Sequence, residues 1–236
     1  MEESGVRCYS RSMIRWVELD TAPVPDGGGV LRLMQRGHEF SIMAGAIELM
    51  NSRLSGSEEA LATLPIQRLE GRAAPHVLIG GYGMGFTLRA ALAALGPDAK
   101  ATVAELIPQV VDWARGPMAD LSAGCLEDGR TAIHLGDVTA LIASSKAAFD
   151  AILLDVDNGP EGLTRRENDR LYNMAGLAAA RRALTPGGVL AVWSSAPDGA
   201  FTERLARAGF KVEEVRVRAR AGKGKARHMI WLATTP

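Results

Sequence analysis

The stretch Pro75-His-Val-Leu-Ile-Gly-Gly-Tyr-Gly-Met-Gly-Phe-Thr-Leu-Arg89 decides the fold. Its apolar run, 76–79, predicts a buried strand, and the apolar spacing over 87–95 predicts a helix. Glycine lets the backbone bend sharply and approach a ligand closely, and the helix that follows presents free N–H groups there. The turn between strand and helix holds three glycines at alternate positions, Gly81, Gly83 and Gly85.

About twenty residues further on, a second strand over 101–104 ends at Glu105. A carboxylate at this point is able to accept both hydroxyls of a ribose. Strand, glycine turn, helix, strand and acid follow in the order typical of a nucleotide site.

Length and composition limit the class of protein and its partners. The chain has 236 residues, zero formal net charge and 47% apolar content. This predicts one large globular domain, or a domain with a small appendage, and no general attraction to nucleic acid. Cys8 and Cys125 lack the number and spacing of a disulfide framework or a metal site, so we expect no metal. The first residues show no apolar signal segment and no run reaches membrane-spanning length, so we expect a cytoplasmic protein without a membrane partner.

The N-terminal part differs from the remainder of the chain. We expect 1–11 to be a flexible terminus and 12–56 to form a small β-strand region, because short, partly alternating segments are separated by turn residues. These strands are predicted at 14–19, 30–35, 39–43 and 46–50. Residues 57–236 are then the nucleotide-binding catalytic domain, starting with a helix over 57–64 that Ser55 or Ser57 caps.

From residue 76 onward, predicted strands and helices alternate. This pattern indicates an α/β fold of Rossmann-like, doubly wound type, with a mainly parallel sheet and helices on both faces. Further strands are expected at 131–135, 150–155 and 189–193, helices at 107–121, 138–144, 168–184 and 200–208, and a terminal hairpin at 211–217 and 228–234. A turn at 185–188, Thr-Pro-Gly-Gly, precedes the strand at 189.

Acidic and glycine residues follow four of these strands. Ligands in such folds bind beyond the carboxyl ends of the strands, so we expect the four positions to converge in one cleft. They are Gly81, Glu105, Asp137 and Asp155.

Residues 76–195 resemble the class I S-adenosylmethionine-dependent methyltransferase fold, and the chain is most similar to the spermidine synthase (polyamine aminopropyltransferase) family. That family also carries a small N-terminal β-region. Gly81-Tyr-Gly-Met-Gly-Phe stands at its glycine turn, Glu105 at its ribose acid, Gly136-Asp137 at its adenine-contacting aspartate, and Asp155 at the start of its acidic signature. The resemblance implies cofactor contacts from Gly81, Tyr82, Gly83, Met84, Gly85, Glu105, Leu106, Gly136, Asp137, Val138 and Asp155.

The chain departs from the family at three places. Met84 stands where the family has an aspartate that holds the amino group of decarboxylated S-adenosylmethionine. Ser57-Glu58-Glu59 replaces a motif that supplies a catalytic tyrosine, and the acidic loop is shortened to Asp155-Val-Asp157-Asn158. The resemblance implies catalytic roles for Asp155 and Asp157, and substrate binding by Glu58, Asp157 and Asn158.

We therefore expect a transferase that uses S-adenosylmethionine or its decarboxylated form and acts on a small-molecule acceptor such as an amine. Met84 and the missing tyrosine favour methyl transfer. The alternatives are aminopropyl transfer and a catalytically silent nucleotide-binding protein. Asp155 would orient the acceptor and receive its proton, or else cap the following loop.

Four features stay open between a functional and a structural role. Asp137 and Asp157 also fit ordinary turns. Tyr82 and Trp193 fit either ligand stacking or the core. The charged loop 161–170 suits a lid or a simple connection. The basic hairpin 216–227 suits an anionic partner or a solvated face, and the exposed N-terminal strands offer edges for a homodimer.

Overall fold

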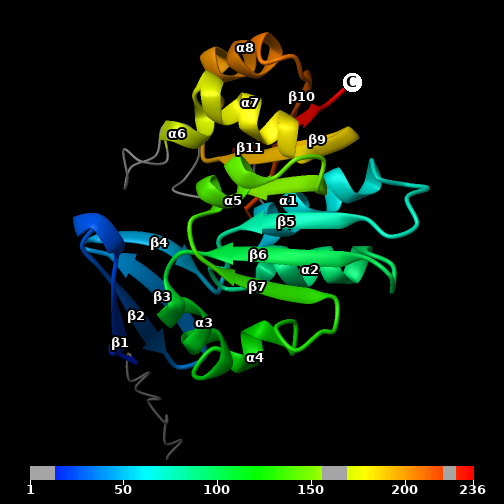
Figure 1. Cartoon of the computed structure of the whole chain (residues 1–236). Helices are drawn as coiled ribbons and strands as arrows, with labels where there is room; N and C mark the ends of the chain where they lie inside the picture. Colours follow the sequence, from blue (N-terminus) through cyan, green and yellow to red (C-terminus); the bar gives the residue numbers. More distant parts are fainter. Residues whose placement is uncertain (1–13, 156–168, 220–226) are drawn as a thin grey trace, which may run out of the picture.

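The computed structural model describes residues 14–155, 169–219 and 227–236 (Figure 1). Two β-sheets organise the chain. The smaller, N-terminal sheet is antiparallel in the order β1-β2-β3-β4 and lies at one end of the larger sheet. It confirms the predicted hairpins, with strands Val17–Pro23, Val30–Arg36, Glu39–Ala44 and Ile47–Asn51.

The larger sheet has seven strands in the order β10-β11-β9-β8-β5-β6-β7. Neighbours from β9 to β7 pair in parallel, and β11 pairs antiparallel with both β9 and β10. This confirms the mainly parallel sheet and the terminal hairpin. The strands are β5 His76–Gly80, β6 Lys100–Glu105, β7 Thr131–Leu135, β8 Phe149–Leu154, β9 Leu184–Ser194, β10 Lys211–Val217 and β11 His228–Thr234.

Helices cover both faces of this sheet, because alternate residues of each buried strand point to opposite sides. In β8, for example, Ala151 and Leu153 belong to one apolar core and Ile152 and Leu154 to the other. The first core packs against α1 Gly56–Gln67, α2 Phe86–Ala94, α3 Pro108–Arg115, α4 Ala119–Ser122 and the N-terminal sheet. The second packs against α5 Val138–Ser144, α6 Asp169–Tyr172, α7 Met174–Ala183 and α8 Gly199–Arg207.

Two helices predicted as continuous are each split in two. The helix expected over 107–121 becomes α3 and α4, because proline at 117 disfavours helical backbone at the residue before it and Gly116 leaves the helical region. The helix expected over 168–184 becomes α6 and α7. Here Asn173 starts the second helix, and its side chain accepts a hydrogen bond from the Gly176 N–H at 2.9 Å.

Strand β9 begins five residues earlier than predicted. Its pairing with β8 shifts between Leu184 and Val189, so the predicted turn at 185–188 is present as an irregularity inside a longer strand. Gly187 has φ +69°, a backbone conformation that favours glycine.

The N-terminal sheet is joined to the larger unit by a buried indole. Trp113 of α3 is 2% exposed, and its Nε1 donates to Asp20 Oδ2 of β1 at 2.7 Å. This contact places β1 beside the last turn of α3, and Met50 of β4 lies near Gly83 of the glycine turn. No helix in the described part of the chain is long and apolar enough to cross a membrane.

Close packing at the junction of α6 and α7 gives a stability prediction. A Cβ at Gly176 would lie 2.0 Å from the carbonyl oxygen of Arg170, a backbone atom that cannot move away locally. We expect Gly176→Ala to destabilise the fold by about 2 kcal/mol or more in denaturant unfolding. Gly199→Ala, at the start of α8 with no atom within 4 Å of the added Cβ, is the matched control and should cost nothing. Equal stability of both variants would contradict the packing described.

Candidate functional site

Strands β5, β6, β7 and β8 run parallel and end at one edge of the sheet, called the carboxyl edge below. Gly81 follows β5, Glu105 ends β6, Asp137 follows β7 and Asp155 follows β8. The structure thus brings the four predicted positions to the same edge.

The glycine turn after β5 has the backbone that glycine was expected to provide. Gly81, Gly83 and Gly85 have φ of +83°, +57° and +78°. The Gly81 N–H donates to the Ala104 carbonyl at 2.8 Å, which joins the turn to β6. A Cβ at Gly83 would lie 2.6 Å from Cε of Met50, so β4 covers the turn from the side of the N-terminal sheet. Because all three φ values are positive, a residue with a Cβ would be strained at each of these positions.

Glu105 is 6% exposed and connects two loops of the site. Its Oε2 accepts the Tyr82 N–H and its Oε1 accepts the Ile107 N–H, both at 2.8 Å. Burial raises the pKa of this carboxyl, and the backbone N–H groups oppose that rise. An ionised carboxylate accepts about four hydrogen bonds, so each oxygen keeps capacity for a ribose hydroxyl.

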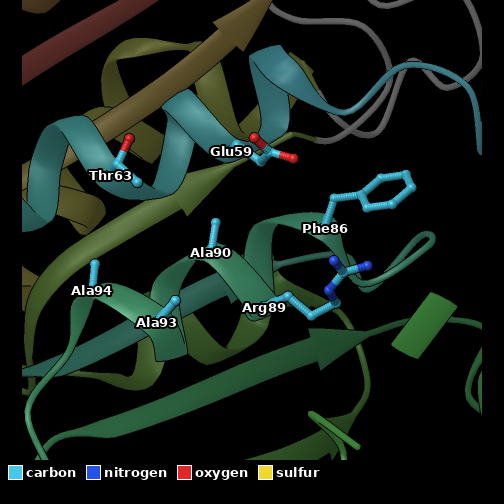
Figure 2. Close-up of a pocket in the computed structure, with 7 residues that line it drawn as sticks. All are labelled: Glu59, Thr63, Phe86, Arg89, Ala90, Ala93 and Ala94. Carbon is cyan, nitrogen blue, oxygen red and sulfur yellow. The ribbon is translucent and has the colours of Figure 1, made fainter. Parts of the chain in front are cut away.

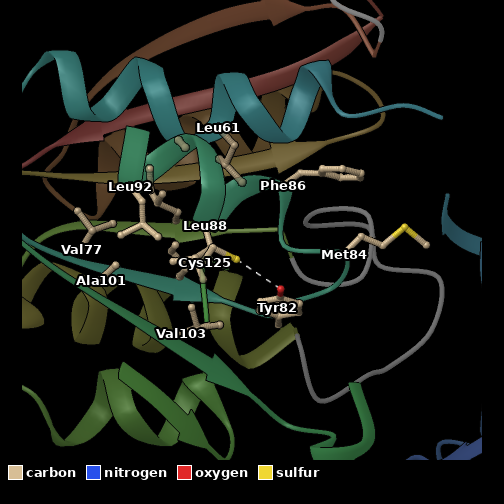
Figure 3. Close-up of a cluster of buried hydrophobic side chains, with 14 of the residues drawn as sticks. Leu61, Val77, Tyr82, Met84, Phe86, Leu88, Leu92, Ala101, Val103 and Cys125 are labelled. Atoms are coloured by element: carbon tan, nitrogen blue, oxygen red, sulfur yellow. Dashed lines mark hydrogen bonds between the residues drawn. The ribbon is translucent and has the colours of Figure 1, made fainter. Parts of the chain in front are cut away.

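Tyr82 and Met84 take different positions in the turn (Figure 3). The ring of Tyr82 lies in the core, where its hydroxyl donates to Ser122 Oγ at 2.8 Å and lies 3.5 Å from Cys125 Sγ. Burial raises the pKa of this phenol well above its usual value, so it stays protonated. The ring of Tyr82 thus belongs to the core, and a contact of this residue with the cofactor stays a prediction for its backbone. Met84 is 2% exposed and brings an uncharged thioether to the turn.

The segment after β7 combines two roles. The Gly136 N–H donates to the Glu105 carbonyl at 2.8 Å. This hydrogen bond holds the segment after β7 beside Glu105 and the adjacent Leu106. Asp137 caps α5, since its Oδ1 accepts the Thr139 N–H at 2.7 Å, and Val138 is buried as the first residue of that helix. Asp137 remains exposed, so its contact with adenine stays a prediction.

Asp155 lies at the end of β8 beside the start of α1. Loss of solvation raises its pKa to about 7, and the nearby carboxylate of Glu58 contributes to the rise. Burial likewise raises the pKa of Glu58. In the described part of the chain, neither carboxylate forms a salt bridge. Two carboxyl groups without a salt-bridge partner in the described part of the chain thus lie near each other at the carboxyl edge.

A group that sequence reasoning missed lies next to these acids. His228 Nδ1 is 3.1 Å from Ser57 Oγ, and that hydroxyl donates to Glu58 Oε2 at 2.8 Å. Trp193 packs edge-on against His228 with ring centroids 4.9 Å apart. Because β11 runs antiparallel to β9, its first residue reaches the carboxyl edge, and the position of His228 at the start of that strand was the available signal.

A separate groove of about 490 Å³ lies between α1 and α2 (Figure 2). It contains none of the predicted site residues, although Glu59 is adjacent to Glu58. Three alanines line its α2 side, and the lining residues are Glu59, Thr63, Phe86, Arg89, Ala90, Ala93 and Ala94.

Several predicted features lie outside the described residues. They are Asp157, Asn158, most of the charged loop 161–170, and Arg220, Lys223 and Lys225 of the basic hairpin. Arg216, Arg218 and Arg227 are described and exposed.

Comparison with known families identifies the family of the chain. Residues 55–199 match the spermine/spermidine synthase domain. The chain belongs to this family. A polyamine aminopropyltransferase of Nitrosomonas europaea is 37% identical over 100 residues, which cover 42% of this chain and 29% of the relative. A polyamine aminopropyltransferase of Mycobacterium tuberculosis strain H37Rv is 32% identical over 127 residues, which cover 52% of this chain and 23% of the relative. The chain thus matches less than a third of the length of these relatives.

Solved structures of the family share the fold. Spermidine synthase from Thermotoga maritima superposes with a TM-score of 0.71 at 19% identity, covering 91% of this chain and 71% of that one. A spermidine synthase in complex with the transition state analogue AdoDATO gives 0.70, at 19% identity and the same coverage. Human methyltransferase-like protein 13 superposes with a TM-score of 0.55 at 18% identity, covering 76% of this chain and 80% of that one. Likeness to methyltransferases is thus one of fold, and the expectation of methyl transfer is not supported.

The raised pKa of Asp155 predicts that this carboxyl lowers the stability of the folded protein at high pH. Its pKa rises from 3.8 to about 7 on folding, so the folded state binds the proton more tightly and stability falls as pH rises through that window. Solvent screening at this partly exposed side chain reduces the free energy needed to keep Asp155 charged in the folded state. We therefore expect Asp155→Asn to be more stable than wild type by about 2 kcal/mol at pH 8.

At pH 3 the stability difference should become small, because Asp155 is then mostly protonated in both the folded and the unfolded state. Urea unfolding at both pH values measures the difference. Asp98→Asn, an exposed acid before β6, is the matched control. A stability difference that does not depend on pH would contradict the raised pKa.

Proposed function

We propose that this protein transfers an aminopropyl group from decarboxylated S-adenosylmethionine to an amine acceptor. The observation that carries the proposal is the pair of acids, Glu58 and Asp155, beside each other at the carboxyl edge without a cationic partner among the described residues. An ammonium group is the natural partner for two such carboxylates, since it offers three donors and a positive charge. The curated relatives named polyamine aminopropyltransferase support the same chemistry.

The nucleotide side of the site fits the adenosine part of the donor. Gly83 and Gly85 add no side chain to the turn, and α2 begins directly after them, so its N-terminal N–H groups are available to a ligand. Glu105 is buried and keeps acceptor capacity for ribose hydroxyls after binding two backbone N–H groups. Met84 has no charge to hold the amino group of the donor, so that role passes to another acid of the site, Glu58 or Asp157.

The reaction needs the acceptor amine in its neutral form. With an ordinary amine pKa near 10.4, removal of its proton at pH 7 costs about 4 to 5 kcal/mol. In our proposal, Asp155 takes this proton, and a pKa of about 7 makes it a better base than an ordinary aspartate. The amine lone pair then forms a C–N bond to the carbon next to sulfur. The C–S bond breaks with its electron pair on sulfur, which leaves a neutral thioether and a secondary ammonium.

Incubation of the protein with decarboxylated S-adenosylmethionine and a panel of diamines and polyamines tests the proposal. Mass spectrometry should find acceptors heavier by one aminopropyl group together with the thioether product. Asp155→Asn should lower kcat by about 100-fold or more while donor affinity changes little, and Asp98→Asn should behave as wild type. Donor binding without turnover on any amine, or full activity of Asp155→Asn, would contradict it.

A further inference from the structure

Sequence reasoning gave no role to His228, although the structure connects this residue to the acids of the site. The terminal strand β11 starts at His228, and its neighbour Met229 pairs with Ser194 at the end of β9. The first residue of α1 is held nearby, since the Gly56 N–H donates to the Ala219 carbonyl at 2.9 Å. Two distant parts of the chain thus meet beside Asp155.

The direction of the hydrogen bonds follows from the number of available protons. Ser57 has one hydroxyl proton and donates it to Glu58 Oε2 at 2.8 Å. The bond of 3.1 Å between Ser57 Oγ and His228 must therefore be donated by His228 Nδ1–H. A neutral imidazole with its proton on Nδ1 carries a lone pair on Nε2. Burial lowers the pKa of His228 and so favours this neutral form.

We propose that Ser57 and His228 are positioning residues that hold Glu58 in its charged form beside Asp155, and thereby set the pH above which Asp155 accepts the proton of the amine. The inference deepens the proposed function and rests on it for the amine. The chain His228–Ser57–Glu58 is called the relay below.

The electrostatics of the relay act in a consistent direction. Burial and the charge of Glu59 raise the pKa of Glu58, while the Ser57 hydroxyl opposes that rise by hydrogen bonding to the carboxylate. A charged Glu58 disfavours a second negative charge nearby, and so raises the pKa of Asp155. Environments that separate the two carboxyl pKa values in this way assign one acid as a fixed charge and the other as a proton acceptor.

Packing keeps the relay in place. Ser57 is 2% exposed, and Trp193, 8% exposed, covers His228 with its ring edge. The charged groups next to His228 along the hairpin are Arg227, which precedes it, and Arg218, which follows its cross-strand partner Val217. Both arginines are exposed, so solvent screens their effect on the imidazole.

The test is the pH dependence of kcat/KM for the full chain, which reports the pKa of the essential base in the free enzyme. Wild type should lose activity below about pH 7, where Asp155 becomes protonated. Ser57→Ala and Glu58→Gln should both move this acidic limb to lower pH by about half a unit or more. Glu58→Gln removes the negative charge beside Asp155, and Ser57→Ala removes the hydrogen bond that favours the charged form of Glu58. Limbs that coincide with wild type, or that move to higher pH, would overturn the proposal.

Variants at the histidine separate the relay from simple packing. His228→Asn retains an N–H donor toward Ser57 and should keep the wild-type limb, whereas His228→Phe removes the donor and should shift the limb in the same direction as Ser57→Ala. The exposed His38, in the turn between β2 and β3, provides the matched control His38→Phe, which should leave the limb in place. Equal limbs for His228→Asn and His228→Phe would overturn the role of the hydrogen bond.

A second readout does not require turnover. Carbon-13 NMR titration of the Asp155 carboxyl in the full chain should give a lower pKa in Ser57→Ala and Glu58→Gln than in wild type. If wild type shows no transfer but the titration shifts, the proposed function fails and the relay stands. If transfer occurs but the titration is unchanged, the relay fails and the proposed function stands.

Discussion

The two hydrogen bonds that Glu105 accepts are the interaction on which the candidate site depends. One comes from the turn after β5 and the other from the segment before α3, and both are 2.8 Å long. The carboxylate is buried, so the loss of either bond would leave a charged oxygen without compensation in a poorly solvated place. Glu105 thus joins the glycine turn after β5 to the segment before α3.

A second constraint is the excess of negative charge at the other side of the same edge. Glu58 and Asp155 are partly buried, and burial raises the pKa of both. The folded protein tolerates this arrangement because most of its stability comes from two apolar cores on opposite faces of the sheet. A destabilised acid at the mouth of a well-packed scaffold is typical of sites that bind a cation or accept a proton.

Much of the fold could be predicted from the sequence because the signals are local. Apolar runs such as 76–79 and strand-end acids such as Glu105 give the parallel sheet and its carboxyl edge. Errors arose where local chemistry competes with periodicity, as at Gly116 and the proline after it, and at Asn173, where a side-chain cap starts a new helix. The pairing of Ser57 with His228 spans 171 positions and depends on strand register, which no local pattern contains. For the chemistry, Met84 and the missing tyrosine favour methyl transfer by sequence, whereas the comparisons support the predicted alternative, aminopropyl transfer.

Calorimetric titration with decarboxylated and intact S-adenosylmethionine tests the central claim most directly, because the two ligands differ by one carboxylate. The acids at the carboxyl edge repel that extra negative charge. We expect the decarboxylated donor to bind at least tenfold more tightly, a difference of about 1.4 kcal/mol. Equal or tighter binding of the intact form would contradict aminopropyl transfer, and binding of neither would contradict the nucleotide site itself.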